Sequence, residues 1–132
     1  MNEDAPYRIT LEDRGEYLYA LVGGETLNPE IAKMYWDEIA ASCRESGIKK
    51  ILIEKDFVKT VSAPEILQMG VYLGSILAGT KIAFFDRYKN EDVNKLGKVI
   101  ARNYGVQMRV FQDVEEAHRW LAGSHEENTG SD

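Results

Sequence analysis

The sequence contains a single cysteine, only two histidines and no long apolar segment. Because Cys43 stands alone, an internal disulfide and a metal site built from several cysteines are excluded. His118 and His125 have no second ligand at a metal-binding spacing, so we expect no metal site. No apolar run approaches the roughly 18 residues that a membrane-spanning helix needs, and we therefore expect no transmembrane segment.

Phosphate-binding motifs and an excess of positive charge are lacking as well. Gly23-Gly24 does not continue into a dinucleotide-binding fingerprint and no Walker A motif occurs, so we expect no cofactor. Sixteen basic against 22 acidic residues give a formal net charge of −6. Binding of nucleic acid needs a basic face, so we expect no nucleic acid partner. The acidic start MNEDAPYR is unlike a signal peptide, which favours a cytoplasmic protein.

What the sequence does contain is a regular alternation of strand and helix signals. Two strands are predicted over residues 7–12 and 17–22, antiparallel across a turn at 13–16, with Gly23-Gly24 ending the second strand. Three later strands are predicted over residues 48–53, 81–85 and 108–111. Four helices are predicted from their N-terminal caps, which are Asn28, Ser62, Asn90 and Asp113.

The order β-β-α-β-α-β-α-β-α predicts an α/β domain. We expect a five-stranded, mostly parallel mixed sheet with four helices. Residues 1–6 should form a flexible arm and residues 7–122 a single domain. The polar, glycine-containing stretch 123–132 should be a disordered tail.

Residues 51–77, ILIEKDFVKTVSAPEILQMGVYLGSIL, form the most informative segment. A short strand should lead through a polar loop at 57–62 into a helix, where Ser62 and Glu65 have the spacing of a capping box. Ligands tend to lie beyond the carboxyl ends of strands, near the free N–H groups of helix starts. Three loops qualify, at residues 23–28, 57–62 and 86–90, and the corner formed by the second of them is the candidate site. Gly70 and Gly74 on the inner helix face should allow close packing on the sheet.

The element order, the chain length and this strand–loop–helix corner resemble the STAS domain family, which includes the anti-sigma-factor antagonists. The resemblance covers residues 7 to about 122 and implies a bacterial regulatory module that binds a protein partner. In that family the corner reads Asp-Ser-Ser-Gly, and a partner kinase phosphorylates the second serine. In this sequence Ser62 falls at the aspartate, Ala63 at the first serine, Pro64 at the phosphorylated serine and Glu65 at the glycine.

The phosphorylated hydroxyl is thus missing from its usual position. The chain more closely resembles the divergent SpoIIAA-like branch, which lacks the phosphorylation motif and has been compared with lipid-carrying domains of the Sec14 type. If a hydroxyl is phosphorylated here, the candidates are Ser62 and Thr60. The structural alternative for Ser62 is a helix cap.

Two functions are left open by the sequence. The first is a non-enzymatic regulatory or interaction module that binds a protein partner near the start of the second helix. The second is a carrier or sensor of a small apolar ligand or lipid held between helices. We expect no catalytic residues, because no base–nucleophile pair is present. The candidate partner- or ligand-binding residues are Lys59, Thr60, Ser62, Ala63, Pro64, Glu65, Ile66, Met69 and Leu73.

The packing of the second helix should separate the two functions. A closed, tightly packed helix favours the partner, whereas a displaced helix that exposes Ile66, Met69 and Leu73 into a cavity favours the carrier. Lys55 and Lys59 near the corner could bind an anion or be solvated loop lysines.

Three further groups of side chains have open roles. Trp36 should be the outward member of the sequence Met34-Tyr35-Trp36, because successive helical residues cannot all face the core. It could be exposed and mark a partner or lipid surface, but we expect partial burial against a neighbouring helix. Glu54 and Asp56 could share a proton or a cation, or form a hydrated strand end. The edge formed by the first two strands, with its tyrosines, could pair two copies into a homodimer.

Overall fold

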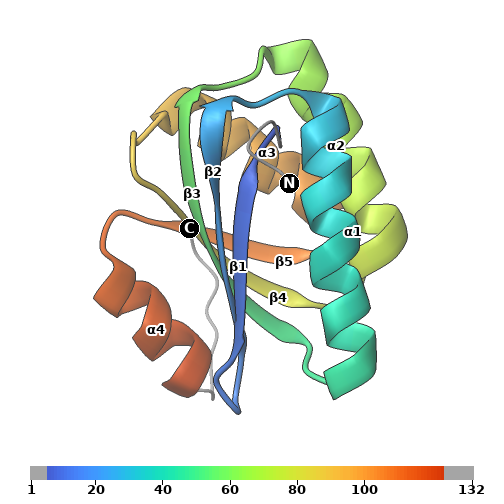
Figure 1. Cartoon of the computed structure of the whole chain (residues 1–132), viewed down its shortest axis with the longest axis vertical. Helices are drawn as coiled ribbons and strands as arrows, with labels where there is room; N and C mark the ends of the chain where they lie inside the picture. Colours follow the sequence, from blue (N-terminus) through green and yellow to red (C-terminus); the bar gives the residue numbers. More distant parts are fainter. Residues whose placement is uncertain (1–5, 124–132) are drawn as a thin grey trace.

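The structure is a computed structural model that describes residues 6–123, in which a mixed sheet is covered by helices on both faces (Figure 1). The strands are β1 (Arg8–Asp13), β2 (Leu18–Thr26), β3 (Lys50–Lys59), β4 (Lys81–Asp86) and β5 (Gln107–Phe111). The helices are α1 (Pro29–Ser46), α2 (Ala63–Leu77), α3 (Glu91–Asn103) and α4 (Val114–Gly123). Residues 1–5 of the predicted arm and 124–132 of the predicted tail lie outside the described residues.

The strands lie in the sheet in their order along the chain, β1-β2-β3-β4-β5. β1 is antiparallel to β2, and every later neighbour is parallel. This confirms the predicted α/β class, the mixed and mostly parallel sheet and the four helices. Among the described residues, no helix is both long enough and apolar enough to cross a membrane.

The helices divide into two layers. α1, α2 and α3 pack beside one another on one face, and α4 contacts β3, β4 and β5 on the other (Figure 1). The larger apolar core lies under α1–α3, and a smaller one lies under α4. β3 contributes to both cores, since Ile53 faces the first and Leu52 the second.

β2 is longer than predicted, because it continues through Gly23-Gly24. In the parallel ladder Gly23 pairs with Asp56 and Gly24 with Phe57. A Cβ atom at Gly23 would lie 2.7 Å from the backbone oxygen of Asp56 and 2.9 Å from Nη2 of Arg8. The glycines thus do not end the strand, and Gly23 permits a close approach within it.

β3 is also longer than predicted, and residues 57–59 belong to the strand instead of a loop. The loop before α2 is therefore short, covering residues 60–62. Side chains of β3 continue to alternate between the two faces of the sheet beyond its apolar run, and one of the inward positions holds a polar residue, Lys55. The inward positions toward α1–α3 are Ile51, Ile53, Lys55 and Phe57.

α1 begins and ends at the predicted caps. The side chain of Asn28 accepts a hydrogen bond from the backbone N–H of Ile31 at 2.8 Å. At the other end Gly47 has a φ of 80°, and its N–H donates to the carbonyl of Cys43 at 2.8 Å. A left-handed residue at this position is the usual place for glycine.

Trp36 is not the outward member of its group, and it is buried against a neighbouring helix, which was the favoured of the two alternatives. Its exposed fraction is 4%, whereas that of Met34 is 41%. The Trp36 ring lies 5.5 Å from that of Tyr35, and both face the space beneath α2. Because α2 covers this side of α1, the buried stripe of α1 is wider than it would be if the helix contacted only the sheet.

α2 packs closely on α3. A Cβ atom at Gly70 would lie 2.3 Å from Cγ2 of Ile100, and one at Gly74 would lie 2.4 Å from Cβ of Tyr104. These glycines therefore bring two helices together, instead of bringing a helix onto the sheet as predicted. α2 is closed against its neighbours, and Ile66 is buried.

Candidate functional site

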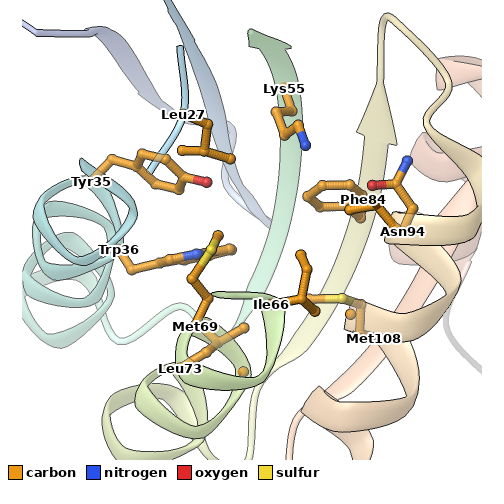
Figure 2. Close-up of a pocket in the computed structure, with 13 residues that line it drawn as sticks. Leu27, Tyr35, Trp36, Lys55, Ile66, Met69, Leu73, Phe84, Asn94 and Met108 are labelled. Atoms are coloured by element: carbon orange, nitrogen blue, oxygen red, sulfur yellow. The ribbon is translucent and has the colours of Figure 1, made fainter. Parts of the chain in front are cut away.

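A small apolar pocket lies beneath the N-terminal half of α2, between the three helices and the sheet (Figure 2). Its volume is about 60 Å³. The residues that line it come from the helices and the loop before α1 and from strands β3, β4 and β5: Leu27, Tyr35, Trp36, Lys55, Ile66, Met69, Gly70, Leu73, Phe84, Val93, Asn94, Gly97 and Met108.

Three of the predicted site residues, Ile66, Met69 and Leu73, line this pocket. They recur at helical spacing on the face of α2 that points toward the sheet. Figure 2 shows their side chains directed toward Trp36 and Met108. These three residues form one wall of the pocket, and their role in binding stays a prediction.

Lys55 is buried in the pocket wall, which rules out the interpretation as a solvated loop lysine. Its Nζ donates to Oγ1 of Thr60 at 3.0 Å and lies 3.7 Å from Oδ2 of Asp86. The side chains of Lys55 and Asp86 are 3% and 1% exposed. Burial lowers the pKa of Lys55, and the charge of Asp86 opposes this shift only in part.

Asp86 ends β4 and is held by several donors. Its carboxylate accepts hydrogen bonds from the N–H of Tyr88 at 3.0 Å, from Nδ2 of Asn90 at 2.9 Å and from Nδ2 of Asn94 at 3.0 Å. Burial raises the pKa of Asp86, but Lys55 and these hydrogen bonds outweigh it and hold the pKa below its usual value. Asn90 was predicted to cap α3, but its side chain instead binds Asp86.

The aromatic wall of the pocket comes from α1. Tyr35 stacks on Phe57 with ring centroids 6.2 Å apart, and Trp36 lies beside it. In Figure 2 the Tyr35 hydroxyl points into the pocket, on the same side as Lys55. Burial, followed by the charge of Asp86, raises the pKa of Tyr35, so this hydroxyl stays protonated.

The predicted corner lies beside the pocket and faces solvent. Ser62, Ala63 and Pro64 are exposed, and Lys59 is exposed at the end of β3. The carboxylate of Glu65 accepts hydrogen bonds from the N–H of Ser62 at 2.9 Å and from its Oγ at 3.1 Å. Ser62 and Glu65 thus act together at the helix start, as the spacing predicted.

The corner gives Ser62 and Thr60 different surroundings. A phosphate on Ser62 would face the Glu65 carboxylate, although a helix N-terminus favours negative charge. The Thr60 hydroxyl already accepts a hydrogen bond from Lys55. Phosphorylation at either residue remains a prediction.

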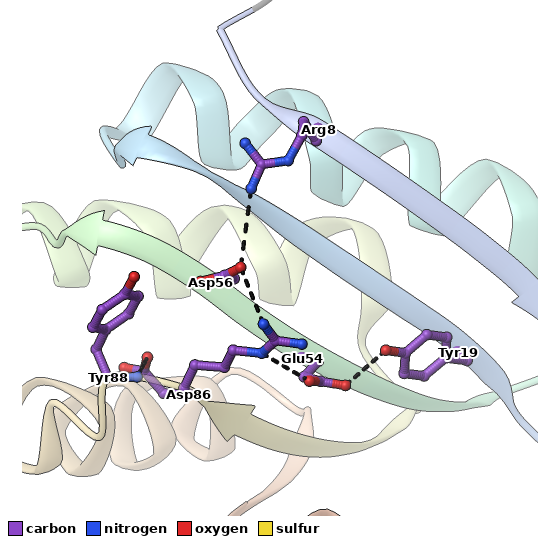
Figure 3. A network of polar contacts seen from close by, with 7 residues as sticks. Arg8, Tyr19, Glu54, Asp56, Asp86 and Tyr88 are labelled. Atoms are coloured by element: carbon purple, nitrogen blue, oxygen red, sulfur yellow. Dashed lines mark hydrogen bonds and ion pairs between the residues drawn. The ribbon is translucent and has the colours of Figure 1, made fainter.

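Glu54 and Asp56 lie on the opposite face of β3, in a network of charged side chains (Figure 3). Arg87 contacts Glu54 at 3.2 Å and Asp56 at 3.4 Å, and Arg8 lies 3.9 Å from Asp56. Tyr19 donates to Glu54 at 2.6 Å. Arginine side chains neutralise both carboxylates, so a shared proton or cation has no support here.

The cysteine and the histidine that the structure describes are both engaged in packing or hydrogen bonding within the domain. Cys43 is buried, and burial raises the pKa of its thiol. Nδ1 of His118 lies 2.6 Å from the hydroxyl of Tyr17. The described part of the chain holds no group of three or more residues that could bind a metal ion. His125 lies outside the described residues.

The prediction from sequence missed the polar end of the pocket. Lys55 was singled out but assigned to a loop, and Asp86 was placed at the start of a candidate loop without a role of its own. One signal was available: Lys55 continues the alternation of inward residues from Ile51 and Ile53. A second signal was the spacing of Asp86, Asn90 and Asn94, which places two amides one and two turns beyond the carboxylate.

A crystal structure with the same arrangement is known. It is of an uncharacterised protein of the DUF3478 family from Shewanella loihica PV-4, described as having a SpoIIAA-like fold, and it matches with a TM-score of 0.53. The match covers 87% of this chain and 93% of the other. This chain has a SpoIIAA-like fold.

The SpoIIAA-like fold confirms the architecture predicted from the STAS-like element order. At 18% sequence identity, the comparison shows the fold alone. No family model matches the sequence, and no curated protein matches it. The role of the pocket and of the corner in this SpoIIAA-like fold therefore rests on their own geometry.

Proposed function

We propose that this protein is a non-enzymatic, STAS-like regulatory module that binds a protein partner through the corner before α2 and the outer face of that helix. The supporting observation is the closed position of α2. Gly70 and Gly74 hold it against α3, and Leu73 is buried. A closed helix leaves its outer face, and not a wide cavity, as the accessible surface.

The outer face of α2 carries apolar side chains that the domain itself does not cover. Leu67 is 50% exposed and Val71 is 39% exposed. At a spacing of four residues they lie next to each other on the helix. The exposed corner residues Ala63 and Pro64 precede them by one turn. Adjacent apolar residues with a polar rim are typical of an interaction site.

Affinity capture with matched variants tests this proposal. Protein retained from the source cells by the wild-type chain should be lost with Leu67→Lys and kept with Val99→Lys, a change at an equally exposed residue of α3. Retention that persists with Leu67→Lys, or no specific retention at all, would contradict the proposal.

A lipid carrier is the second candidate, and the apolar lining of Ile66, Met69 and Leu73 favours it. However, pockets for drug-sized ligands have volumes of about 300–1,000 Å³, whereas this one has about 60 Å³. A phospholipid or long acyl chain would require α2 to move away. Native mass spectrometry with added fatty acid or phospholipid tests this candidate, and ligand-free protein throughout would exclude it.

Phosphorylation would add regulation to the partner site. Phosphopeptide mapping of protein from cells should place phosphate on Ser62 before Thr60, because Ser62 is the more exposed of the two. Absence of phosphate at both residues while a partner kinase is active would remove the switch and leave the partner site intact.

A further inference from the structure

The pocket beneath α2 has a polar end that its own residues do not fully use. Lys55 and Tyr35 both line that end, whereas Met69 and Leu73 form the apolar end (Figure 2). A fully apolar pocket would be filled by packing or stay dry. Hydrogen-bonding groups at one end instead indicate a molecule that is polar at one end.

The hydroxyl of Tyr35 is buried without a partner. The side chain is 1% exposed, and no hydrogen bond joins this hydroxyl to any other residue that the structure describes. It points into the pocket (Figure 2). A buried hydroxyl without a hydrogen bond is destabilising, so an acceptor at this point in the pocket would be bound favourably.

Lys55 has hydrogen-bonding capacity to spare. An ammonium group has three donors, and Thr60 takes one of them at 3.0 Å. Asp86 lies 3.7 Å away, which is too far for a hydrogen bond. The ammonium is directed toward the pocket in Figure 2. Burial lowers the pKa of Lys55 more than Asp86 raises it, so a further acceptor in the pocket would stabilise the ammonium form.

Asp86 is kept from closing onto Lys55 by its other contacts. Hydrogen bonds from Tyr88, Asn90 and Asn94 fix its carboxylate at the start of α3. The arrangement holds a charged lysine in place while leaving one side of its ammonium open to the pocket.

The size of the pocket limits the apolar part of the molecule. An apolar cavity of about 150 Å³ accommodates benzene, and this pocket has about 60 Å³. The ligand-free space therefore suits a short chain. Met69 is partly exposed and unbranched, so its side chain can move to admit a few more carbons.

We propose that this pocket is a binding site for a short-chain carboxylate. The carboxylate lies between Nζ of Lys55 and the hydroxyl of Tyr35, and the chain lies against Met69 and Leu73. A carboxylate accepts strong, charge-assisted hydrogen bonds from donors such as an ammonium and a hydroxyl. The site is independent of the partner surface, because Leu67 and Val71 lie on the opposite side of α2.

The two tryptophans provide a direct test in the intact protein. Trp36 lines the pocket, whereas Trp120 lies on α4 across the sheet. In a heteronuclear NMR titration with acetate, butanoate, hexanoate and octanoate, the indole N–H signal of Trp36 should shift saturably and that of Trp120 should not. Butanamide and butan-1-ol at the same concentrations should produce much smaller shifts.

Tyr35→Phe tests the head group without disturbing the fold. It removes only the unpaired hydroxyl, so its thermal midpoint should equal or exceed that of the wild type. Its affinity for the best carboxylate should fall about tenfold, the loss expected for one hydrogen bond to a charged group. Tyr72→Phe, which removes a hydroxyl bonded to Asp37 on the helix surface, should leave the affinity unchanged.

Three results would overturn this proposal. The first is that no carboxylate shifts the Trp36 signal, which would mean that the pocket holds only water. The second is that the amide or the alcohol binds as well as the acid. The third is that Tyr35→Phe binds the carboxylate as tightly as the wild type does. None of them bears on the partner surface, which Leu67→Lys tests separately.

Discussion

Lys55 and Asp86 show how one buried ion pair can shape a small domain. Removing two charges from water is costly, and the attraction between them offsets that cost only when further hydrogen bonds satisfy both groups. Asp86 is satisfied by Asn90 and Asn94, but Lys55 is not fully satisfied. The pair is therefore better explained by a role in the pocket than by a contribution to stability.

Single and double substitutions of this pair should have very different effects. Asp86→Asn alone leaves Lys55 buried without a counter-charge and should lower the free energy of unfolding by about 3–5 kcal/mol. Lys55→Met with Asp86→Asn removes both charges and should cost much less than the sum of the two single changes. Urea unfolding of the three variants measures this coupling, and additive losses would show that the two groups do not interact.

At the scale of the elements, the contact between α2 and α3 is the feature that closes the domain. Gly70 and Gly74 bring α2 against Ile100 of α3 and against Tyr104, the residue that follows α3. Gly97, on the α3 side of the pocket, has no such constraint, because a Cβ atom added there would lie 3.9 Å from its nearest neighbour, Cγ2 of Ile66. The three glycines look alike in the sequence but differ in what surrounds them.

Alanine substitutions should therefore change stability in opposite directions. Gly97→Ala should raise the free energy of unfolding by up to about 1 kcal/mol, because alanine is the better helix former. Gly74→Ala should lower it by about 1–3 kcal/mol, because the added carbon would lie 2.4 Å from Cβ and 2.8 Å from the carbonyl oxygen of Tyr104. Thermal unfolding with circular dichroism measures both. Equal destabilisation by the two changes would mean that the close approach at Gly74 is not limiting.

Local signals predicted the elements well, because most of them depend on nearby residues. Asn28 and Gly47 bound α1 through contacts within a few positions of the chain. The end of β3 was missed because the burial of Lys55 depends on Asp86, which arrives with the next strand. The burial of Trp36 is more complete than predicted, because it depends on how closely α2 covers α1. The pocket follows from these contacts between distant segments, so its polar end was not predictable from local patterns.

For the whole molecule, the buried pair predicts how stability depends on pH. Asp86 has a pKa below its ordinary value of 3.8 in the folded state. Its contribution is therefore fully present above 3.8 and is lost as the pH falls through the lower folded pKa. Lys55 acts at the other end, since its lowered pKa makes stability rise as the pH increases toward 10.5.

Urea unfolding as a function of pH tests this prediction. The wild type should lose stability below pH 3.8 more steeply than the double variant Lys55→Met, Asp86→Asn, in which no charge is left unpaired. Asp92→Asn, at an exposed residue in the first turn of α3, serves as the control and should keep the wild-type slope. Identical slopes in all three proteins would contradict a role for Asp86.

β1 forms one of the two edges of the sheet, and a homodimer paired through this edge was predicted as an option. Tyr17 is buried against α4, and Tyr7 is bonded to Glu38 of α1, so neither is free for pairing at this edge. A dimer at this edge would therefore have to be held by backbone hydrogen bonds between two β1 strands, and sedimentation equilibrium would detect it. Thr10→Pro removes one backbone donor from β1, so a dimer that persists in this variant would place the contact elsewhere.

The sign of charge alternates along the second half of β3, and this limits how the strand can pair. Glu54 and Asp56 face the arginines on the open side, while Lys55 faces Asp86 on the covered side. A slip of one residue would bring two carboxylates against Asp86 and leave the lysine facing the arginines. Misaligned sheets are thus penalised by repulsion on both faces. Lys55, which lines the pocket, and its acidic neighbours Glu54 and Asp56 on the opposite face together hold the strand in one register.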